Sequence, residues 1–198
     1  MLNLEYLQNL NKKQLEAVSY LSGPLLIVAG AGSGKTKVLT SRISHIIKDK
    51  KAFPNQILAV TFTNKAAREM HHRVSNTLKR EAAGMPWLGT FHSISAKLLR
   101  KHAKAAGLNS RFTIIDQEDQ KRLIKNICKS EKIDIKKISP NFILSVIDKW
   151  KNKGWHPDEV VLKKKDFLEK GFLKIYKIYQ KKLIDLNTCD FSDLILHC

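Results

Sequence analysis

The fold is decided by the stretch Ala29-Gly30-Ala31-Gly32-Ser33-Gly34-Lys35-Thr36. A continuous apolar run, residues 24–29, precedes the glycines and predicts a strand that is buried on both faces. After them, apolar residues recur at the spacing of a helix face: Val38, Leu39, Ile43, Ile46 and Ile47. A strand, a glycine-rich turn and a helix in this order surround an anion with backbone N–H groups and the positive end of a helix. The stretch therefore predicts a phosphate-binding loop within an α/β fold.

Two side chains of this loop are candidate catalytic residues. Lys35 is expected to reach the β- and γ-phosphates of a nucleotide, and the Thr36 hydroxyl is expected to ligate Mg²⁺. Ala29 stands where the general motif has its first glycine, and a small residue suffices there. The candidate nucleotide-binding residues of the loop are Ala29, Gly30, Ala31, Gly32, Ser33, Gly34, Lys35 and Thr36. The alternative is a glycine-rich turn with an incidental lysine.

Further strands and helices alternate after the loop. Residues 57–62 and 87–91 read as strands, and apolar residues at helical spacing follow each of them. This alternation predicts the parallel sheet of a P-loop NTPase. From residue 116 onward, apolar residues recur at helical spacing in three segments, so residues 116–198 are predicted to be all-helical.

The formal net charge of +18 is unevenly distributed. Residues 1–115 contain 18 Lys and Arg against 5 Asp and Glu, whereas residues 116–198 contain 18 against 13. A basic surface favours polyanions, because phosphate contacts release counterions. Biased codon usage would give the same excess of lysine, so charge alone leaves both interpretations open. Its concentration in the first part favours nucleic acid bound there.

Other bulk features exclude several classes of protein. The three cysteines, at positions 128, 189 and 198, follow no metal-ligand spacing. No apolar run approaches the length of a membrane span, and the N-terminus has no signal-peptide pattern. We therefore expect a cytoplasmic protein without a membrane partner.

Three more segments accompany the loop in a fixed order. Leu10-Asn11-Lys12-Lys13-Gln14 precedes it, and Ala59-Val60-Thr61-Phe62-Thr63-Asn64-Lys65-Ala66-Ala67-Arg68-Glu69-Met70 and Gly89-Thr90-Phe91-His92-Ser93 follow it. Together with the loop they resemble the first motifs of the UvrD/Rep/PcrA type of superfamily 1 helicase. The similarity extends to Asp190-Phe191-Ser192-Asp193-Leu194. It implies an ATP-dependent DNA helicase that uses ATP and Mg²⁺ and moves 3′ to 5′ along single-stranded DNA, unwinding duplex junctions in repair or replication.

The resemblance adds two candidate ATP-binding residues outside the loop. Gln14 would read adenine, since its side-chain amide offers a donor and an acceptor. Lys37 falls where relatives often carry an arginine against the base. Lysine lacks the planar guanidinium and stacks less well, which weakens that role at Lys37.

The resemblance also implies DNA-binding residues, namely Phe62, Thr63, Asn64, Phe91 and His92. The chemistry agrees, because a phenylalanine ring offers a face on which a base can stack. Polar side chains between a strand end and a helix N-terminus suit a phosphate. The alternatives are a core phenylalanine, an asparagine that caps a helix and a structural histidine.

The resemblance further predicts how the chain is organised. Residues 1–115 would be a partial RecA-like motor domain with the phosphate loop and the first DNA contacts, and residues 116–198 an all-helical insertion subdomain. Hydrolysis also needs a carboxylate site for Mg²⁺, and no apolar strand ending in two adjacent acids occurs in the sequence. We therefore expect a chain truncated before its acidic Mg-binding motif, which binds ATP and DNA but hydrolyses little by itself.

Competing interpretations remain at this point. A small-molecule kinase would use the phosphate loop but leave residues 61–65 unexplained. A non-hydrolysing basic DNA-binding module would bind DNA regardless of ATP. The motor part of a recombination helicase–nuclease shares the same first motifs. Protein partners cannot be inferred from the sequence.

Overall fold

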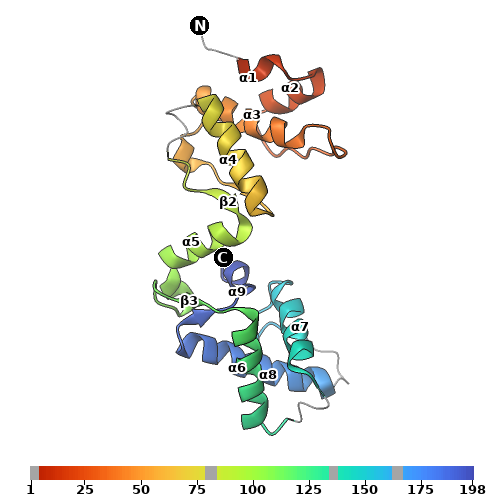
Figure 1. The fold of residues 1–198 in the computed structure, drawn as a ribbon, viewed down its shortest axis with the longest axis vertical. Coiled ribbons are helices and arrows are strands. Elements are labelled where there is room, and N and C mark those ends of the chain that lie inside the picture. Colours follow the sequence, from red (N-terminus) through yellow and green to blue (C-terminus); the bar gives the residue numbers. More distant parts are fainter. Residues whose placement is uncertain (1–4, 79–83, 134–137, 162–166) are drawn as a thin grey trace. The chain divides into compact units, whose positions relative to one another are not determined.

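The computed structural model describes residues 5–78, 84–133, 138–161 and 167–198 (Figure 1). The chain forms two compact units, Met1–Ile94 and Ser95–Cys198. The division falls within one helix, α5 (Phe91–Lys101). The domain boundary between residues 115 and 116 stays a prediction about the organisation of the motor.

The first unit contains α1 (Glu5–Gln8), α2 (Lys12–Ser19), α3 (Lys35–Lys48), a 3-10 turn (Pro54–Gln56), β1 (Ala59–Thr61), α4 (Asn64–Leu78), β2 (Leu88–Thr90) and the start of α5. β1 and β2 pair in parallel, with Ala59 opposite Leu88 and Thr61 opposite Thr90. Parallel neighbours need a crossover connection, and α4 supplies it. This confirms the alternating strand–helix order predicted for residues 57–91.

The core of the first unit lies between α3, α4 and the strand pair. α3 and α4 run side by side (Figure 1). Both helices are amphipathic, and their apolar faces bury side chains against the strands. The buried cluster consists of Ile43, Ile47, Ala59, Met70, Val74, Leu78 and Met85.

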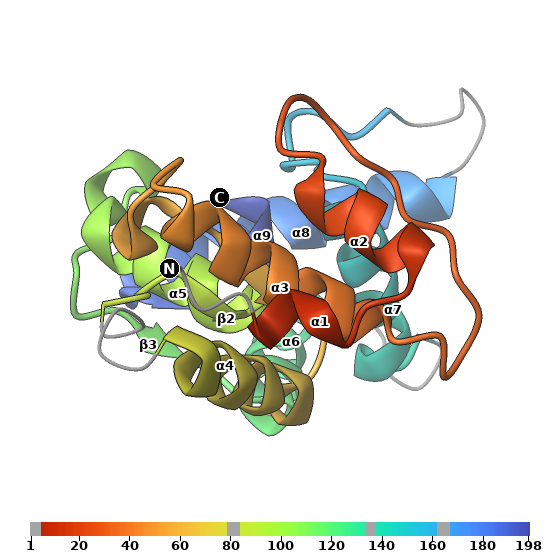
Figure 2. The same ribbon diagram turned by 90° about the horizontal axis from the view of Figure 1, so that it is seen from above.

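The strand predicted at residues 24–29 is absent. These residues form part of the long loop between α2 and α3, which Figure 2 shows in red to orange. Leu26 is 87% exposed and Val28 is 88% exposed. A strand buried on both faces requires hydrogen-bonded neighbours, and in the described residues the first unit forms only the β1–β2 pair. The prediction was wrong at this point, and the sheet of a complete P-loop NTPase is not seen.

The second unit is mainly helical. After a 3-10 turn (Ala103–Ala106) come β3 (Thr113–Ile114), α6 (Gln117–Ser130), α7 (Pro140–Lys151), α8 (Phe167–Asp185), β4 (Thr188–Cys189) and α9 (Asp193–Leu196). Asp116 caps α6 by accepting from Asp119 N, and Ser139 caps α7 just before Pro140. β3 and β4 form a parallel pair, so the predicted all-helical description of residues 116–198 was wrong for Thr188–Cys189. Hydrogen bonds between residues far apart in the sequence, such as that from Thr113 N to Asn187 O, hold this strand pair, and local sequence patterns do not predict them.

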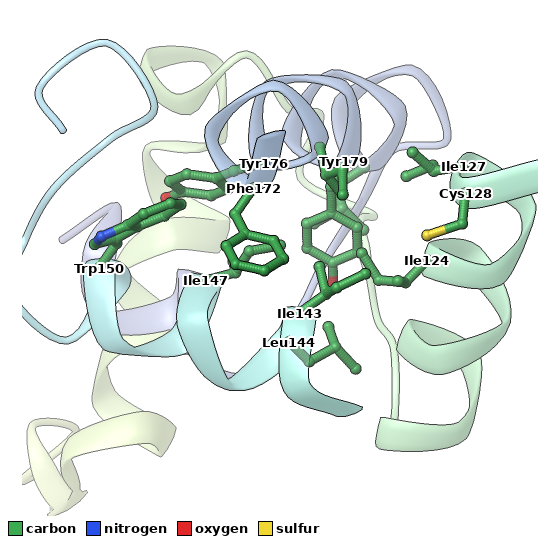
Figure 3. Packing of buried hydrophobic residues seen from close by; sticks show 12 residues of the cluster. Ile124, Ile127, Cys128, Ile143, Leu144, Ile147, Trp150, Phe172, Tyr176 and Tyr179 are labelled. Carbon is green, nitrogen blue, oxygen red and sulfur yellow. The ribbon is translucent and has the colours of Figure 1, made fainter. Parts of the chain in front are cut away.

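The core of the second unit lies between α6, α7 and α8 (Figure 3). Ile124, Ile143 and Ile147 meet the aromatic face of α8 there. The ring centroids of Trp150 and Tyr176 lie 5.9 Å apart, and Trp150 is a buried core residue. Over the described ranges, no helix has both the length and the apolar character needed to cross a bilayer.

A charged cluster is buried beside this core. Lys151 Nζ lies 2.6 Å from Asp190 Oδ2 and 2.6 Å from Asp193 Oδ1, and all three side chains are at most 1% exposed. Tyr179 donates from its hydroxyl to Asp190, and Gln180 Nε2 donates to Asp193, each at 2.9 Å. A single cation therefore ties the segment after β4 to the end of α7.

Candidate functional site

The phosphate loop is a glycine-dependent turn in front of α3. Gly32 has φ +75° and Gly34 has φ +84°, and residues other than glycine rarely adopt this backbone conformation. Ser33 Oγ donates to the Gly30 carbonyl at 2.7 Å and closes the turn. Gly34 is the N-cap of α3, so the free N–H groups of the first helical turn follow directly.

Lys35 and Thr36 occupy the first two positions of α3. Lys35 Nζ donates to the carbonyls of Ala29 at 2.8 Å and Gly30 at 2.6 Å, so the ammonium lies over the loop. The loop therefore presents backbone donors, a helix N-terminus, an ammonium and a hydroxyl within a few residues. This donor set fits an anionic phosphate chain with its Mg²⁺.

Gln14 is brought onto the phosphate loop by a capping box. Asn11 caps α2 and accepts from Gln14 N at 2.9 Å, while Gln14 Oε1 accepts from Asn11 N at 3.0 Å. The other end of the same amide, Nε2, donates to the Ser33 carbonyl at 3.0 Å. This hydrogen bond joins α2 to the phosphate loop, although Gln14 and Ser33 are 19 residues apart in the sequence.

A cavity of about 210 Å³ opens between α2 and the loop. Ile27 and Val28 give it apolar walls, and Gln14 gives it a polar one. This combination of apolar walls and few oriented polar groups is typical of a small-ligand pocket. Its lining residues are Asn11, Lys13, Gln14, Ala17, Ile27, Val28, Ala29, Ser33, Lys35 and Val38.

Lys37 does not line this cavity. It is half-buried on α3, and its Nζ donates to the Asn9 carbonyl on the other side of α2. The Lys37 ammonium therefore binds the protein backbone in this structure. Its predicted contact with the base stays a prediction.

The aromatic candidates meet at the ends of the two strands. Phe62 follows β1 and Phe91 follows β2, and since Thr61 pairs with Thr90 the two rings come into register. Their centroids lie 5.3 Å apart with an interplanar angle of 46°. Phe62 is 90% exposed and Phe91 is 40% exposed. The core alternative for Phe62 is thus excluded, and an aromatic pair faces solvent.

The polar candidates directly follow these two phenylalanines in the sequence. Thr63 Oγ1 accepts from Ala66 N at 3.1 Å, so Thr63 caps α4, and Asn64 is its first helical residue. The expectation that Asn64 caps this helix was wrong. His92 is half-buried at the start of α5, and burial lowers its pKa below the usual value, so the imidazole is neutral at pH 7.

Gly89 and Ser93 hold the aromatic candidates in place. Ser93 Oγ accepts from Thr90 N at 2.9 Å, and Thr90 Oγ1 accepts from Ser93 N at 3.2 Å, so α5 begins with a reciprocal cap. A Cβ on Gly89 would lie 2.6 Å from Ser93 Oγ. Ser93 therefore has a structural role.

Arg42 was not identified from the sequence. Its Nη1 donates to the carbonyl of Ala17 at 2.7 Å and to that of Tyr20, at the end of α2. The sequence predicts only that Arg42 lies in a helix, because its hydrogen-bond partners come from a segment more than 20 residues earlier. Arg42 connects the helix that starts at the phosphate loop with the helix that carries Gln14.

Residues 10–198 match the family model of the UvrD/REP helicase N-terminal domain. The chain is 44% identical over 200 residues to a probable DNA helicase II homolog of Rickettsia conorii, which covers 100% of this chain and 30% of the relative. It is 44% identical over 189 residues to the ATP-dependent DNA helicase PcrA of Staphylococcus epidermidis, covering 96% of this chain and 26% of the relative. It is 45% identical over 201 residues to DNA helicase II of Rickettsia typhi, covering 100% of this chain and 30% of the relative. The chain spans less than a third of the length of these relatives.

Proposed function

Because the chain belongs to the UvrD/REP helicase N-terminal domain family, we propose that it supplies the ATP-binding loop and the first single-strand contacts of an ATP-dependent DNA helicase. The complete motor would translocate 3′ to 5′ on single-stranded DNA and open duplex junctions. Such a motor moves when ATP closes the cleft between two motor domains and changes their grips on the strand. The chain described here would bind both ligands.

Nucleotide binding would use the loop and α2. The backbone donors around Gly32 to Gly34 and the Lys35 ammonium would hold the phosphates, and the Thr36 hydroxyl would ligate Mg²⁺. Magnesium, when bound, neutralises phosphate charge and usually keeps water and phosphate oxygens as further ligands. Thr36 would serve as a ligand together with the phosphates.

Base recognition would rely on Gln14. Its Oε1 and Nε2 each make one bond in the structure, which leaves one lone pair and one N–H available. Adenine offers a donor at N6 and an acceptor at N7, whereas guanine offers two acceptors on the same edge. The free lone pair of Gln14 Oε1 can accept from adenine N6, and the free N–H of Nε2 can donate to adenine N7.

The single observation that carries the DNA-binding proposal is the exposed pair of Phe62 and Phe91. Two neighbouring rings that are open to solvent offer flat apolar faces on which a base can stack, which supports a binding surface here. Single-stranded nucleic acid is bound by aromatic faces with about 1–3 kcal/mol per stacked base. Thr63, Asn64 and the neutral His92 lie next to the rings and would contact phosphate or base edges.

The test is a titration of fluorescent oligothymidine with the chain and with Phe62→Leu. Loss of a stacked base predicts affinity that is lower by about 5- to 150-fold, with an unchanged unfolding midpoint because the ring is exposed. Phe53→Leu is the matched control, since Phe53 is 72% exposed in the same unit and lies outside the predicted DNA-contact segments. Equal affinities for wild type, Phe62→Leu and Phe53→Leu would refute the assignment of the aromatic pair to DNA.

A further inference from the structure

Two cationic side chains of α3 reach the two ends of α2. Lys37 donates from Nζ to the carbonyl of Asn9, which precedes the first turn of α2. Arg42, five residues further along α3, donates from Nη1 to the carbonyls of Ala17 and Tyr20. α2 is therefore held at its beginning and at its end by the same neighbouring helix.

These contacts add to the packing of α2 against α3. With eight residues, α2 is too short to be stable in isolation, and its buried apolar side chain is Val18. The last carbonyls of a helix lack partners within the helix, and a guanidinium there satisfies them and the negative end of the dipole. The position of α2 relative to the phosphate loop thus depends on the bonds from Lys37 and Arg42.

Gln14 lies between these two attachment points and is oriented by its neighbours. The Asn11 N–H can only donate, so it selects Oε1, and the Ser33 carbonyl can only accept, so it selects Nε2. A hypothetical Cβ on Gly34 would lie 2.9 Å from Gln14 Nε2, which shows how closely the amide approaches the loop. A displacement of α2 from the loop would break the bond from Nε2 to Ser33 and carry the amide away from the loop, whereas the bond to Asn11 belongs to the cap of α2 and would move with it.

We propose that Lys37 and Arg42 are positioning residues for base selection. By holding α2, they keep the Gln14 amide against the loop, where its remaining acceptor and donor match adenine and mismatch guanine. α3 then links two parts of one site, since it begins with the phosphate residues Lys35 and Thr36 and also fixes the base reader. The inference rests on the proposed function, in which Gln14 contacts the base.

The experiment compares the affinities of Mg-ATP, Mg-GTP and Mg-tripolyphosphate by calorimetry. Wild type is compared with Arg42→Gln, Arg42→Lys and Lys37→Met, and Lys12→Met is the control because Lys12 is an exposed lysine on α2 itself. We expect Arg42→Gln and Lys37→Met to reduce the preference for ATP over GTP about fivefold, the effect of one misdirected hydrogen bond. Tripolyphosphate affinity should not change, and Arg42→Lys should keep part of the preference.

The possible outcomes distinguish a failure of nucleotide binding from a failure of the positioning role. If wild type binds none of the three ligands, the proposed function fails. If wild type prefers ATP and the variants keep the full preference, the positioning role is refuted while nucleotide binding stands. An equal loss for all three ligands would also refute it, because the residues would then act on the stability of the whole unit. Arg42→Lys decides the matter if Arg42→Gln does not fold, as judged by circular dichroism, because Lys37 is itself a candidate contact to the base.

Discussion

Lys151→Met tests the buried charge cluster of the second unit most severely. The substitution keeps the length and apolar stem of the side chain but removes the ammonium that lies 2.6 Å from both Asp190 and Asp193. Breaking a buried ion pair from one side leaves an uncompensated charge and costs about 3–5 kcal/mol. Asp190 and Asp193 would keep their bonds to Tyr179 and Gln180, so we expect a loss within that range at pH 7.5.

The loss of stability in Lys151→Met should depend on pH. In wild type, burial and the charge of Asp193 raise the pKa of Asp190. Burial also tends to raise the pKa of Asp193, but the charge and hydrogen bond of Lys151 outweigh it and the net pKa is lowered. Without Lys151, both carboxyl groups would have folded-state pKa values above the unfolded ones. Protonation would then favour the folded state, so the deficit should shrink as the pH falls from 7.5 to 5.

Urea unfolding followed by tryptophan fluorescence measures the effect, since Trp150 and Trp155 lie in this unit. Lys149→Met is the matched control, because Lys149 is exposed on the same helix and its loss should change stability by less than about 0.5 kcal/mol. A loss below about 1 kcal/mol for Lys151→Met, or a deficit that does not change between pH 7.5 and 5, would refute the reasoning.

Two further predictions concern stability. Gly89→Ala should lower the free energy of unfolding by about 1–3 kcal/mol, measured by thermal unfolding, because its Cβ would lie 2.6 Å from Ser93 Oγ and 3.2 Å from Ile94 Cδ1. The double variant Gly89→Ala/Ser93→Ala should lose less stability than the sum of the two single variants. Strict additivity would contradict the clash. His197→Gln should flatten the pH dependence of stability between pH 7 and 5.5. Burial lowers the folded-state pKa of His197, so the unfolded state takes up the proton first and wild type loses stability as the pH falls through about 6.5; equal slopes for both proteins would contradict this.

Local patterns predicted the elements that carry strong local signals. The helix after Gly34 and the parallel order of β1 and β2 follow from the glycines and from the periodicity of apolar residues, and the structure confirms them. The family was also predicted correctly, since four ordered motifs are more specific than one loop. Residues 24–29 failed because an apolar run shows the tendency to form a strand but not whether neighbouring strands are present to pair with it.

Long-range partners could not be predicted from the sequence. The Phe62–Phe91 pair depends on the register of β1 and β2, although each ring had been chosen as a candidate. The contacts of Arg42 and the burial of Lys151 depend on segments 22 to 42 residues away in sequence. A charged residue on a helix looks the same in a sequence whether it is solvated or buried. Only its three-dimensional neighbours distinguish the two.

The most direct measurement is a calorimetric titration of Mg-ATP into wild type and Lys35→Ala. Lys35 is exposed and its bonds are to the loop itself, so the variant should fold with an unchanged circular dichroism spectrum. The account predicts measurable binding by wild type, and none by Lys35→Ala, because the ammonium is the main positive charge for the phosphates. Equal affinity of the two proteins would contradict the assignment of the loop, and with it the central claim that this chain carries the ATP site of a helicase.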